Sequence, residues 1–166
     1  MSITHAEPLT RRLALRQALA LAGAAVFSLP LRALTGGHQT PMTVWKDPSC
    51  GCCKDWVAHL QASGFQVTVN DSGNESARAR LGIPGKLGSC HTAQVGGYAI
   101  EGHVPARDIQ RLLKERLRVI GLAVPGMPVG SPGMDAPIYG GRKDPYDVLL
   151  INTDGSTRVY QSYHRT

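Results

Sequence analysis

The residues best suited to chemistry are cysteines, and residues 47–56 (DPSCGCCKDW) hold three of the four in the chain. Cys50 and Cys53 have C-x-x-C spacing, so both side chains can face one side of the first turn of a helix. At a helix N-terminus, the backbone N–H groups and the helix dipole favour a thiolate. This spacing suits either thiol–disulfide exchange or metal binding.

Cys52 helps to separate these two kinds of chemistry. A disulfide oxidoreductase needs one attacking and one resolving thiol, and a third thiol beside them invites wrong pairing. Adjacent cysteines such as Cys52 and Cys53 rarely pair, because a disulfide requires Cα atoms about 4.4–6.8 Å apart. A metal site gains a soft ligand from each added thiolate. The third cysteine therefore favours metal, although a C-x-x-C pair in an exported chain is more often a disulfide.

Further ligand candidates lie later in the chain. Cys90 and His91 open a predicted strand, where neighbouring side chains point to opposite faces. At least one of the two should therefore face away from any single site, and we expect Cys90 to face inward and leave His91 open. His103, at the far end of the following hairpin, is another candidate. The other histidines are expected to be surface or structural residues: His5, His38, His59 and His164.

Two methionines, Met127 and Met134, share the local sequence Pro-Gly-Met. Taken alone, a methionine is more often a core residue than a ligand. Thioethers and thiolates are soft donors that select Cu(I), whereas Zn(II) takes cysteine and histidine and rarely methionine. A third clustered cysteine, Cys90 and two PGM segments coincide in one small domain, and this coincidence favours a copper site.

The elements that must position these residues are predicted from hydrophobic period and turn residues. Residues 42–47 are a β-prone run, residues 52–62 carry an apolar helical stripe, and residues 65–70 alternate like a half-buried strand. Such a β-α-β unit implies parallel strands with a right-handed crossover.

The same signals predict a short polar helix over 75–82, a hairpin that turns at Gly96 and Gly97, and a helix opened by Pro105. The order β-α-β-α-β-β-α is typical of an α/β domain that is thioredoxin-like. If the third strand pairs beside the first, its start lies near the cysteine run.

The last part of the chain has a different character. Residues 121–145 are crowded with glycine and proline, show no period and contain both PGM segments, which predicts a packed loop. Residues 146–163 then predict a closing C-terminal β-hairpin with its turn at Asp154 and Gly155.

The first 34 residues have the pattern of an export signal. Three arginines, Arg11, Arg12 and Arg16, precede an uncharged apolar run over 18–31, which is shorter than the roughly 20 residues that span a bilayer. The segment TRRLALR also resembles a twin-arginine signal, although the phenylalanine usual in that motif is missing. We expect a cleavable signal over 1–34, a linker over 35–41, one domain over 42–166, and no stable membrane insertion after cleavage.

The charge distribution argues against a nucleic-acid partner. The chain carries a net +6, and residues 1–34, with four arginines and one glutamate, supply +3 of it. The remaining +3 is small for a nucleic-acid surface, and the basic residues are scattered rather than gathered in a stripe.

Three motifs, in order, resemble one known family. The segments CGCCKDWVAHL, SCHTAQVGGYAIEGHVPA and GLAVPGMPVGSPGM are similar to the small exported bacterial copper-resistance proteins of the CopG type, over about residues 42–135. The resemblance implies a periplasmic, thioredoxin-like protein that handles excess copper, with several ions bridged by cysteines or cycled between Cu(I) and Cu(II). Thioredoxins themselves place a cis-proline just before the third strand, where this chain has Ser89 and Cys90.

We therefore expect an exported, periplasmic copper-binding protein, rather than an enzyme, that sequesters or transfers Cu(I) in copper resistance. Other envelope copper-handling proteins are its candidate partners, and the methionine loop is expected to fold over the site as a lid. The ligands or close supporting residues implied by the resemblance are Cys50, Cys52, Cys53, Cys90, His103, Met127 and Met134. Two alternatives stay open: an envelope thiol-disulfide oxidoreductase that uses Cys50 and Cys53, and a structural disulfide domain that binds a partner.

Overall fold

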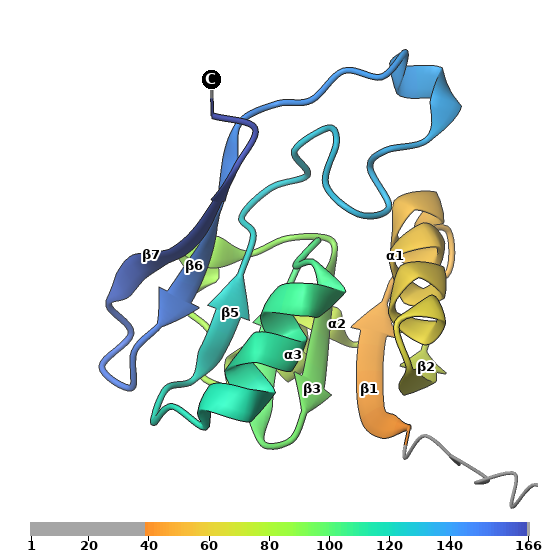
Figure 1. Ribbon diagram of the computed structural model, residues 1–166. Helices are drawn as coiled ribbons and strands as arrows, with labels where there is room; N and C mark the ends of the chain where they lie inside the picture. The colour runs from red at the N-terminus through yellow and green to blue at the C-terminus, as the bar shows by residue number, and fades with distance from the viewer. Residues whose placement is uncertain (1–38, 166) are drawn as a thin grey trace, which may run out of the picture. The chain divides into compact units, whose positions relative to one another are not determined.

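A computed structural model describes residues 39–165, so the predicted signal and most of the predicted linker lie outside the described residues (Figure 1). The described chain forms a mixed α/β structure around one seven-stranded sheet of order β2-β1-β3-β4-β5-β6-β7. The strands are β1 (Thr40–Lys46), β2 (Phe65–Asn70), β3 (His91–Val95), β4 (Tyr98–Glu101), β5 (Gly121–Ala123), β6 (Tyr146–Ile151) and β7 (Thr157–Tyr163). The helices are α1 (Gly51–Ala62), α2 (Asn74–Arg80) and α3 (Ala106–Glu115). None of these helices is long and apolar enough to cross a membrane.

The first three elements form the expected β-α-β unit, in which β1 and β2 pair in parallel. β1 begins at Thr40, inside the segment that the sequence suggests as a linker. One face of α1 is buried because Cys53, Trp56, Val57 and Leu60 recur at helical spacing. Gly64, with a φ of 90°, then supplies the left-handed turn into β2.

The predicted hairpin consists of β3 and β4, joined by Gly96 and Gly97, whose φ angles of 55° and 88° suit a two-residue turn. β3 also pairs antiparallel with β1, and the last pair of that ladder is Lys46 with His91. The end of β1, the start of α1 and the start of β3 therefore meet at one end of the sheet.

The region predicted as a loop over 121–145 contains a strand, because residues 121–123 form β5, parallel to β4. Three residues are too few to show a period, so the sequence pattern does not reveal this strand. Gly121 is required there, because a Cβ at this position would overlap the backbone of Ala99 in β4. The closing hairpin is present as β6 and β7, with a register shift at Val148/Leu149.

Two hydrophobic clusters lie on the two faces of the sheet. The larger one joins α1 and α3 to the strands through residues such as Trp56, Ile109 and Leu122. The smaller one packs Ile83 and Leu87, which follow α2, against the opposite face. Adjacent strand residues separate cleanly between the clusters, because successive side chains of a strand alternate.

Candidate metal centre

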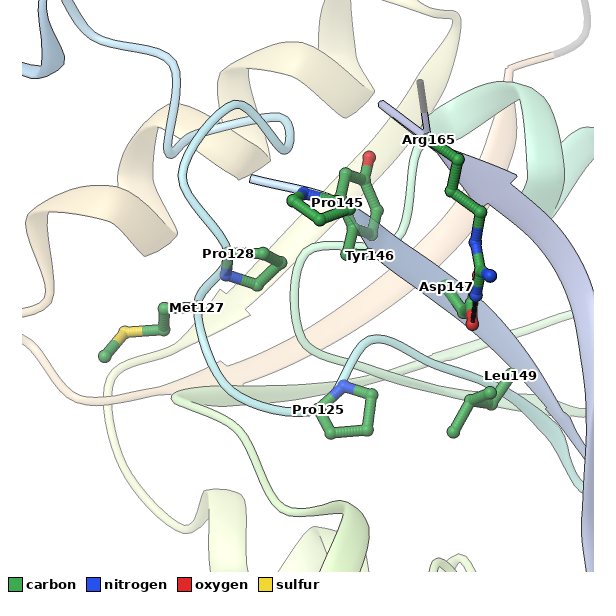
Figure 2. A pocket seen from close by; sticks show the side chains of 8 residues that line it. All are labelled: Pro125, Met127, Pro128, Pro145, Tyr146, Asp147, Leu149 and Arg165. Atoms are coloured by element: carbon green, nitrogen blue, oxygen red, sulfur yellow. Dashed lines mark hydrogen bonds and ion pairs between the residues drawn. The ribbon is translucent and has the colours of Figure 1, made fainter. Parts of the chain in front are cut away.

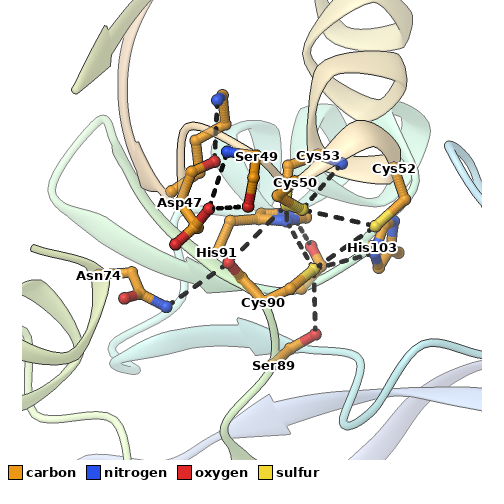
Figure 3. Close-up of a disulfide and its surroundings, with 12 residues drawn as sticks. Asp47, Ser49, Cys50, Cys52, Cys53, Asn74, Ser89, Cys90, His91 and His103 are labelled. Atoms are coloured by element: carbon orange, nitrogen blue, oxygen red, sulfur yellow. Dashed lines mark hydrogen bonds between the residues drawn. A yellow bond between two sulfur atoms is a disulfide. The ribbon is translucent and has the colours of Figure 1, made fainter. Parts of the chain in front are cut away.

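Three cysteines lie around the N-terminus of α1, and the fourth approaches from the start of β3 (Figure 3). Cys50 and Cys53 form a disulfide, and Cys52 and Cys90 are free thiols. The Sγ atom of Cys52 is 3.5 Å from that of Cys50 and 4.0 Å from that of Cys90. The four sulfur atoms lie within 4.8 Å of one another, close enough to share metal ions once the disulfide is reduced.

The helix terminus explains the geometry of the first three sulfurs. Cys50 is the N-cap residue of α1, and its Sγ accepts a hydrogen bond from the backbone N–H of Cys53 at 3.3 Å. Cys53 is buried, whereas Cys50 and Cys52 are partly exposed. The helix thus presents its first-turn sulfurs toward β3 and leaves two of them accessible.

Two buried histidines point a nitrogen at the same cluster. His91 Nδ1 lies 3.3 Å from Cys90 Sγ and 3.4 Å from Cys53 Sγ, and His103 Nε2 lies 3.3 Å from Cys90 Sγ. The other nitrogen of each ring meets a backbone carbonyl: that of Gly102 at 3.0 Å for His91 and that of Pro132 at 2.9 Å for His103. Because a carbonyl can only accept, those nitrogens carry the protons, and the lone pairs face the sulfurs.

Carbonyl-oriented imidazoles of this kind are typical of metal-binding histidines, since the second hydrogen bond fixes both tautomer and ring orientation. Cys90, His91 and His103 form a second group whose ligand atoms lie within 4.8 Å of one another. Cys90 belongs to both groups. The cluster therefore offers four sulfur and two nitrogen donors, a set suited to a soft metal ion.

The expectation that Cys90 or His91 faces away from the site is wrong, because both side chains face the cluster. The strand begins at His91, so Cys90 precedes it and the alternation of a strand does not apply to the pair. His91 is thus a site residue left open at the sequence level. A predicted strand start at His91 instead of Cys90 would have allowed both side chains to face the cluster.

Burial sets the protonation of the metal-free cluster. It raises the pKa of the Cys90 thiol to about 12, and the nearby Cys52 thiol acts in the same direction, against the hydrogen bond from Ser89. Burial also lowers the pKa of His91 to about 3, helped by His103, and lowers that of His103 itself. Near neutral pH the imidazoles are therefore uncharged and Cys90 is a thiol, so a metal ion that binds Cys90 must displace a proton.

Aromatic packing closes the inner side of the cluster. The ring of Trp56 packs against that of His91 with centroids 4.2 Å apart and the ring planes tilted by 34°, and His91 meets His103 edge-on at 4.9 Å. Trp56 is fully buried, and its indole N–H donates to the carbonyl of Val104 at 2.9 Å. These contacts fix the His91 ring and keep water from this side.

The loop that carries the two PGM segments is attached to the rim of the cluster. The hydroxyl of Ser89 donates to the carbonyl of Gly126 at 2.6 Å, and the carbonyl of Pro132 accepts from His103. Gly133 packs so closely on α1 that a Cβ there would lie 2.8 Å from the backbone nitrogen of Trp56. Each PGM segment is therefore held beside a cluster residue.

The two methionines of this loop differ in exposure. Met134 is buried, and its Sδ accepts from the hydroxyl of Tyr139 at 3.7 Å. Met127 is 53% exposed and borders an open pocket of about 780 Å³, with its side chain turned away from the other lining residues (Figure 2). That pocket is lined by neither cysteine nor histidine, so the cysteine and histidine donor atoms lie outside it. The role of Met127 and Met134 as ligands stays a prediction.

Comparison with known proteins gives two kinds of match. Residues 87–134, which include Cys90, His103 and both PGM segments but not the C-x-C-C run, match a family described as proteins of unknown function, DUF411. Two solved structures of a copper-resistance protein CopG, form 1 and form 2, have 48% and 46% sequence identity and TM-scores of 0.69 and 0.68. Each match covers 75% of this chain and 98% of the solved chain. No curated protein matches the chain.

Proposed function

We propose a function from one premise: the chain belongs to the family of the copper-resistance protein CopG. The protein binds copper as Cu(I), its cargo, through the reduced thiolates of Cys50, Cys52, Cys53 and Cys90. The observation that carries this proposal is the convergence of four sulfur atoms within 4.8 Å, because clustered soft donors favour Cu(I) and can bridge several ions.

The surrounding residues have distinct parts in this function. His103 and His91 supply nitrogen donors at the Cys90 side, where their lone pairs already face the sulfur. Met127 and Met134 serve as thioether ligands or as a lid at the rim, a role supported by the attachment of their loop to Ser89 and His103. As part of copper resistance, the protein sequesters Cu(I) or transfers it to other copper-handling proteins.

The oxidised form of the site cannot offer all four thiolates. Reduction of the Cys50–Cys53 disulfide by a dithiol takes up two electrons and two protons and yields two thiols, while the dithiol becomes a disulfide. Each thiol then loses its proton as a metal ion binds. A thiol reductant, or loading of copper before oxidation, is therefore part of the proposal.

The cellular setting is proposed from the sequence. An export signal over 1–34 directs a domain over 42–166 to the periplasm, and a twin-arginine route would allow copper to load before export. A thioredoxin-like core is supported by the strand order β2-β1-β3-β4, in which β3 runs antiparallel to β1 and β4.

Anaerobic loading of the reduced full chain with Cu(I) tests the proposal. Metal analysis should give at least one bound equivalent, and X-ray absorption should show sulfur ligation and, for a bridged cluster, copper–copper scattering. The variant Cys50→Ser with Cys53→Ser should lose this binding, because two of the four sulfurs are gone. Less than one equivalent in the wild type, or undiminished binding in the double variant, would contradict the proposal.

The methionines need a separate comparison with a matched control. Met127→Leu and Met134→Leu should weaken Cu(I) binding if the thioethers are ligands. Met42→Leu removes a buried core methionine in β1 and should leave binding unchanged. Unchanged Cu(I) affinity in all three variants would show that the ligands are cysteine and histidine alone.

A second candidate function is thiol–disulfide exchange, favoured by the observed Cys50–Cys53 disulfide at a helix N-terminus. It predicts insulin reduction that needs Cys50 and Cys53 and is indifferent to Met127→Leu and Met134→Leu. A structural disulfide domain would show neither thiol–disulfide exchange nor copper binding. Added Cu(I) would then leave the melting temperature unchanged, whereas a bound ion raises it by mass action.

A further inference from the structure

Cys90, the thiol that closes the cluster, lies outside the regular sheet. The last pair of the β1–β3 ladder is Lys46 with His91, so Ser89 and Cys90 come before the first residue that the ladder fixes. The three other thiols share one helical turn, but the distance from Cys90 to them depends on contacts outside the ladder.

An ion pair supplies those contacts by holding both backbone polar groups of Ser89. The Ser89 N–H donates to Oε1 of Glu101 at 2.7 Å, and the Ser89 carbonyl accepts from Nη2 of Arg78 at 2.7 Å. Arg78 and Glu101 are themselves joined, with Nε and Nη2 each 2.9 Å from Oε1. The residue that precedes Cys90 is thus held from α2 and from the end of β4.

The burial of this pair indicates what it contributes. Glu101 is fully buried, and its second oxygen accepts from the hydroxyl of Thr92 at 2.7 Å. Apolar side chains in the place of a buried ion pair often give the same or greater stability, because burying charged groups costs them hydration. Apolar side chains would, however, provide neither an acceptor nor a donor for the Ser89 backbone.

α2 supports the same turn at a second point, since the side chain of Asn74 donates to the carbonyl of Cys90 at 3.5 Å. The hydroxyl of Ser89 donates to the carbonyl of Gly126, in the loop that carries the two PGM segments. Every polar group of Ser89 is therefore engaged, which fixes the direction in which the chain enters Cys90.

We propose that Arg78 and Glu101 are positioning residues that hold Ser89 so that the Cys90 thiol meets the three thiols of α1 and the two imidazoles. This inference rests on the proposed function. The ion pair thus fixes the backbone of this turn through hydrogen bonds, as a proline would fix it through its ring.

A double-mutant cycle on Cu(I) affinity tests the proposal in the reduced full chain, with a chromophoric Cu(I) chelator as competitor. Arg78→Met keeps the aliphatic stem, removes the contacts to Ser89 and Glu101, and should weaken affinity by about 10- to 100-fold, as loss of a ligand-orienting partner does. In a Cys90→Ser background the same substitution should cause no further loss. Arg111→Met, which breaks the 2.8 Å ion pair to Glu115 on α3, is the matched control and should leave affinity unchanged.

A copper-free measurement separates this proposal from the proposed function. In a chain with Cys50, Cys52 and Cys53 replaced by serine, Arg78→Met should raise the alkylation rate of Cys90 several-fold, because the freed turn exposes the thiol. Arg78→Lys, which keeps the charge, should give a smaller increase and serves if Arg78→Met does not fold. Unchanged alkylation, or an equal affinity loss with and without Cys90, would overturn the proposal, whereas weak copper binding by the wild type would contradict the proposed function instead.

Discussion

The two halves of the cluster are held in place in different ways. On the helix side, Cys50, Cys52 and Cys53 are set by a single turn of α1 and its cap. On the strand side, Cys90, His91 and His103 depend on partners from distant segments, including Gly102, Pro132 and the Arg78–Glu101 pair. Local geometry suffices for the first half, whereas the second requires most of the domain to be folded. The strand side should therefore be the more sensitive to substitution.

The largest effect is expected at Glu101. Glu101→Ala leaves the guanidinium of Arg78 and the N–H of Ser89 without their acceptor in a partly buried place, which should cost about 3 kcal/mol of the free energy of unfolding, the lower end for breaking a buried pair. Urea unfolding of the reduced, copper-free protein measures this loss. Glu115→Ala breaks an exposed ion pair on α3 and should cost far less stability. Equal losses in the two variants would contradict the greater sensitivity of the strand side.

The second-largest effect is expected on acidification, which should lower the stability of the fold through the strand side. Burial lowers the pKa of His91 from 6.5 to about 3, so the unfolded state binds more protons than the folded state between these values. Stability is then fully present above the unfolded pKa and is lost as the pH falls below it, by about 2 kcal/mol at pH 5 from His91 alone.

Unfolding midpoints of the copper-free protein at pH 7.5 and pH 5 check this prediction. His91→Gln keeps a donor for the Gly102 carbonyl but cannot take up a proton, so it should show a smaller fall. His59 and His103, whose pKa values burial also lowers, should maintain the rest of the fall. An identical fall in variant and wild type would show that His91 does not contribute.

The smallest effect is expected on the helix side. In the reduced protein, Cys50→Ala removes the acceptor for the N–H of Cys53, whereas Cys50→Ser replaces it with a good N-cap oxygen. The alanine variant should be less stable than the serine variant by about 0.5–1 kcal/mol, the lower part of the usual cost of losing a serine cap, because solvent reaches the terminus. Thermal unfolding under reducing conditions compares the two, and a difference of several kcal/mol would make the helix side as sensitive as the strand side.

The same contrast explains what the sequence could predict. The helix predicted over 52–62, which begins one residue earlier in the structure, the strand over 65–70 and the hairpin turn at Gly96 and Gly97 follow from period and turn residues, which are local properties. The position of the C-x-C-C run at a helix start follows for the same reason. These predictions needed no knowledge of what packs against each element.

The remaining features depend on contacts between distant segments. His91 faces the cluster because β3 begins one residue later than expected, and β5 exists because Gly121 can approach Ala99. Neither the carbonyl partners of the two histidines nor the grip of Arg78 and Glu101 on Ser89 has a spacing that marks it. These features therefore become visible once the chain is folded.

The contact between the Trp56 and His91 rings has a practical consequence. The chain contains two tryptophans, and the other, Trp45, packs under the guanidinium of Arg80, 4.9 Å from its ring centroid. A phenylalanine at position 45 would leave a lone indole whose emission arises in van der Waals contact with an imidazole of the cluster. The protein thus carries its own fluorescent reporter, through which arrival and departure of an ion could be followed in real time without any attached dye.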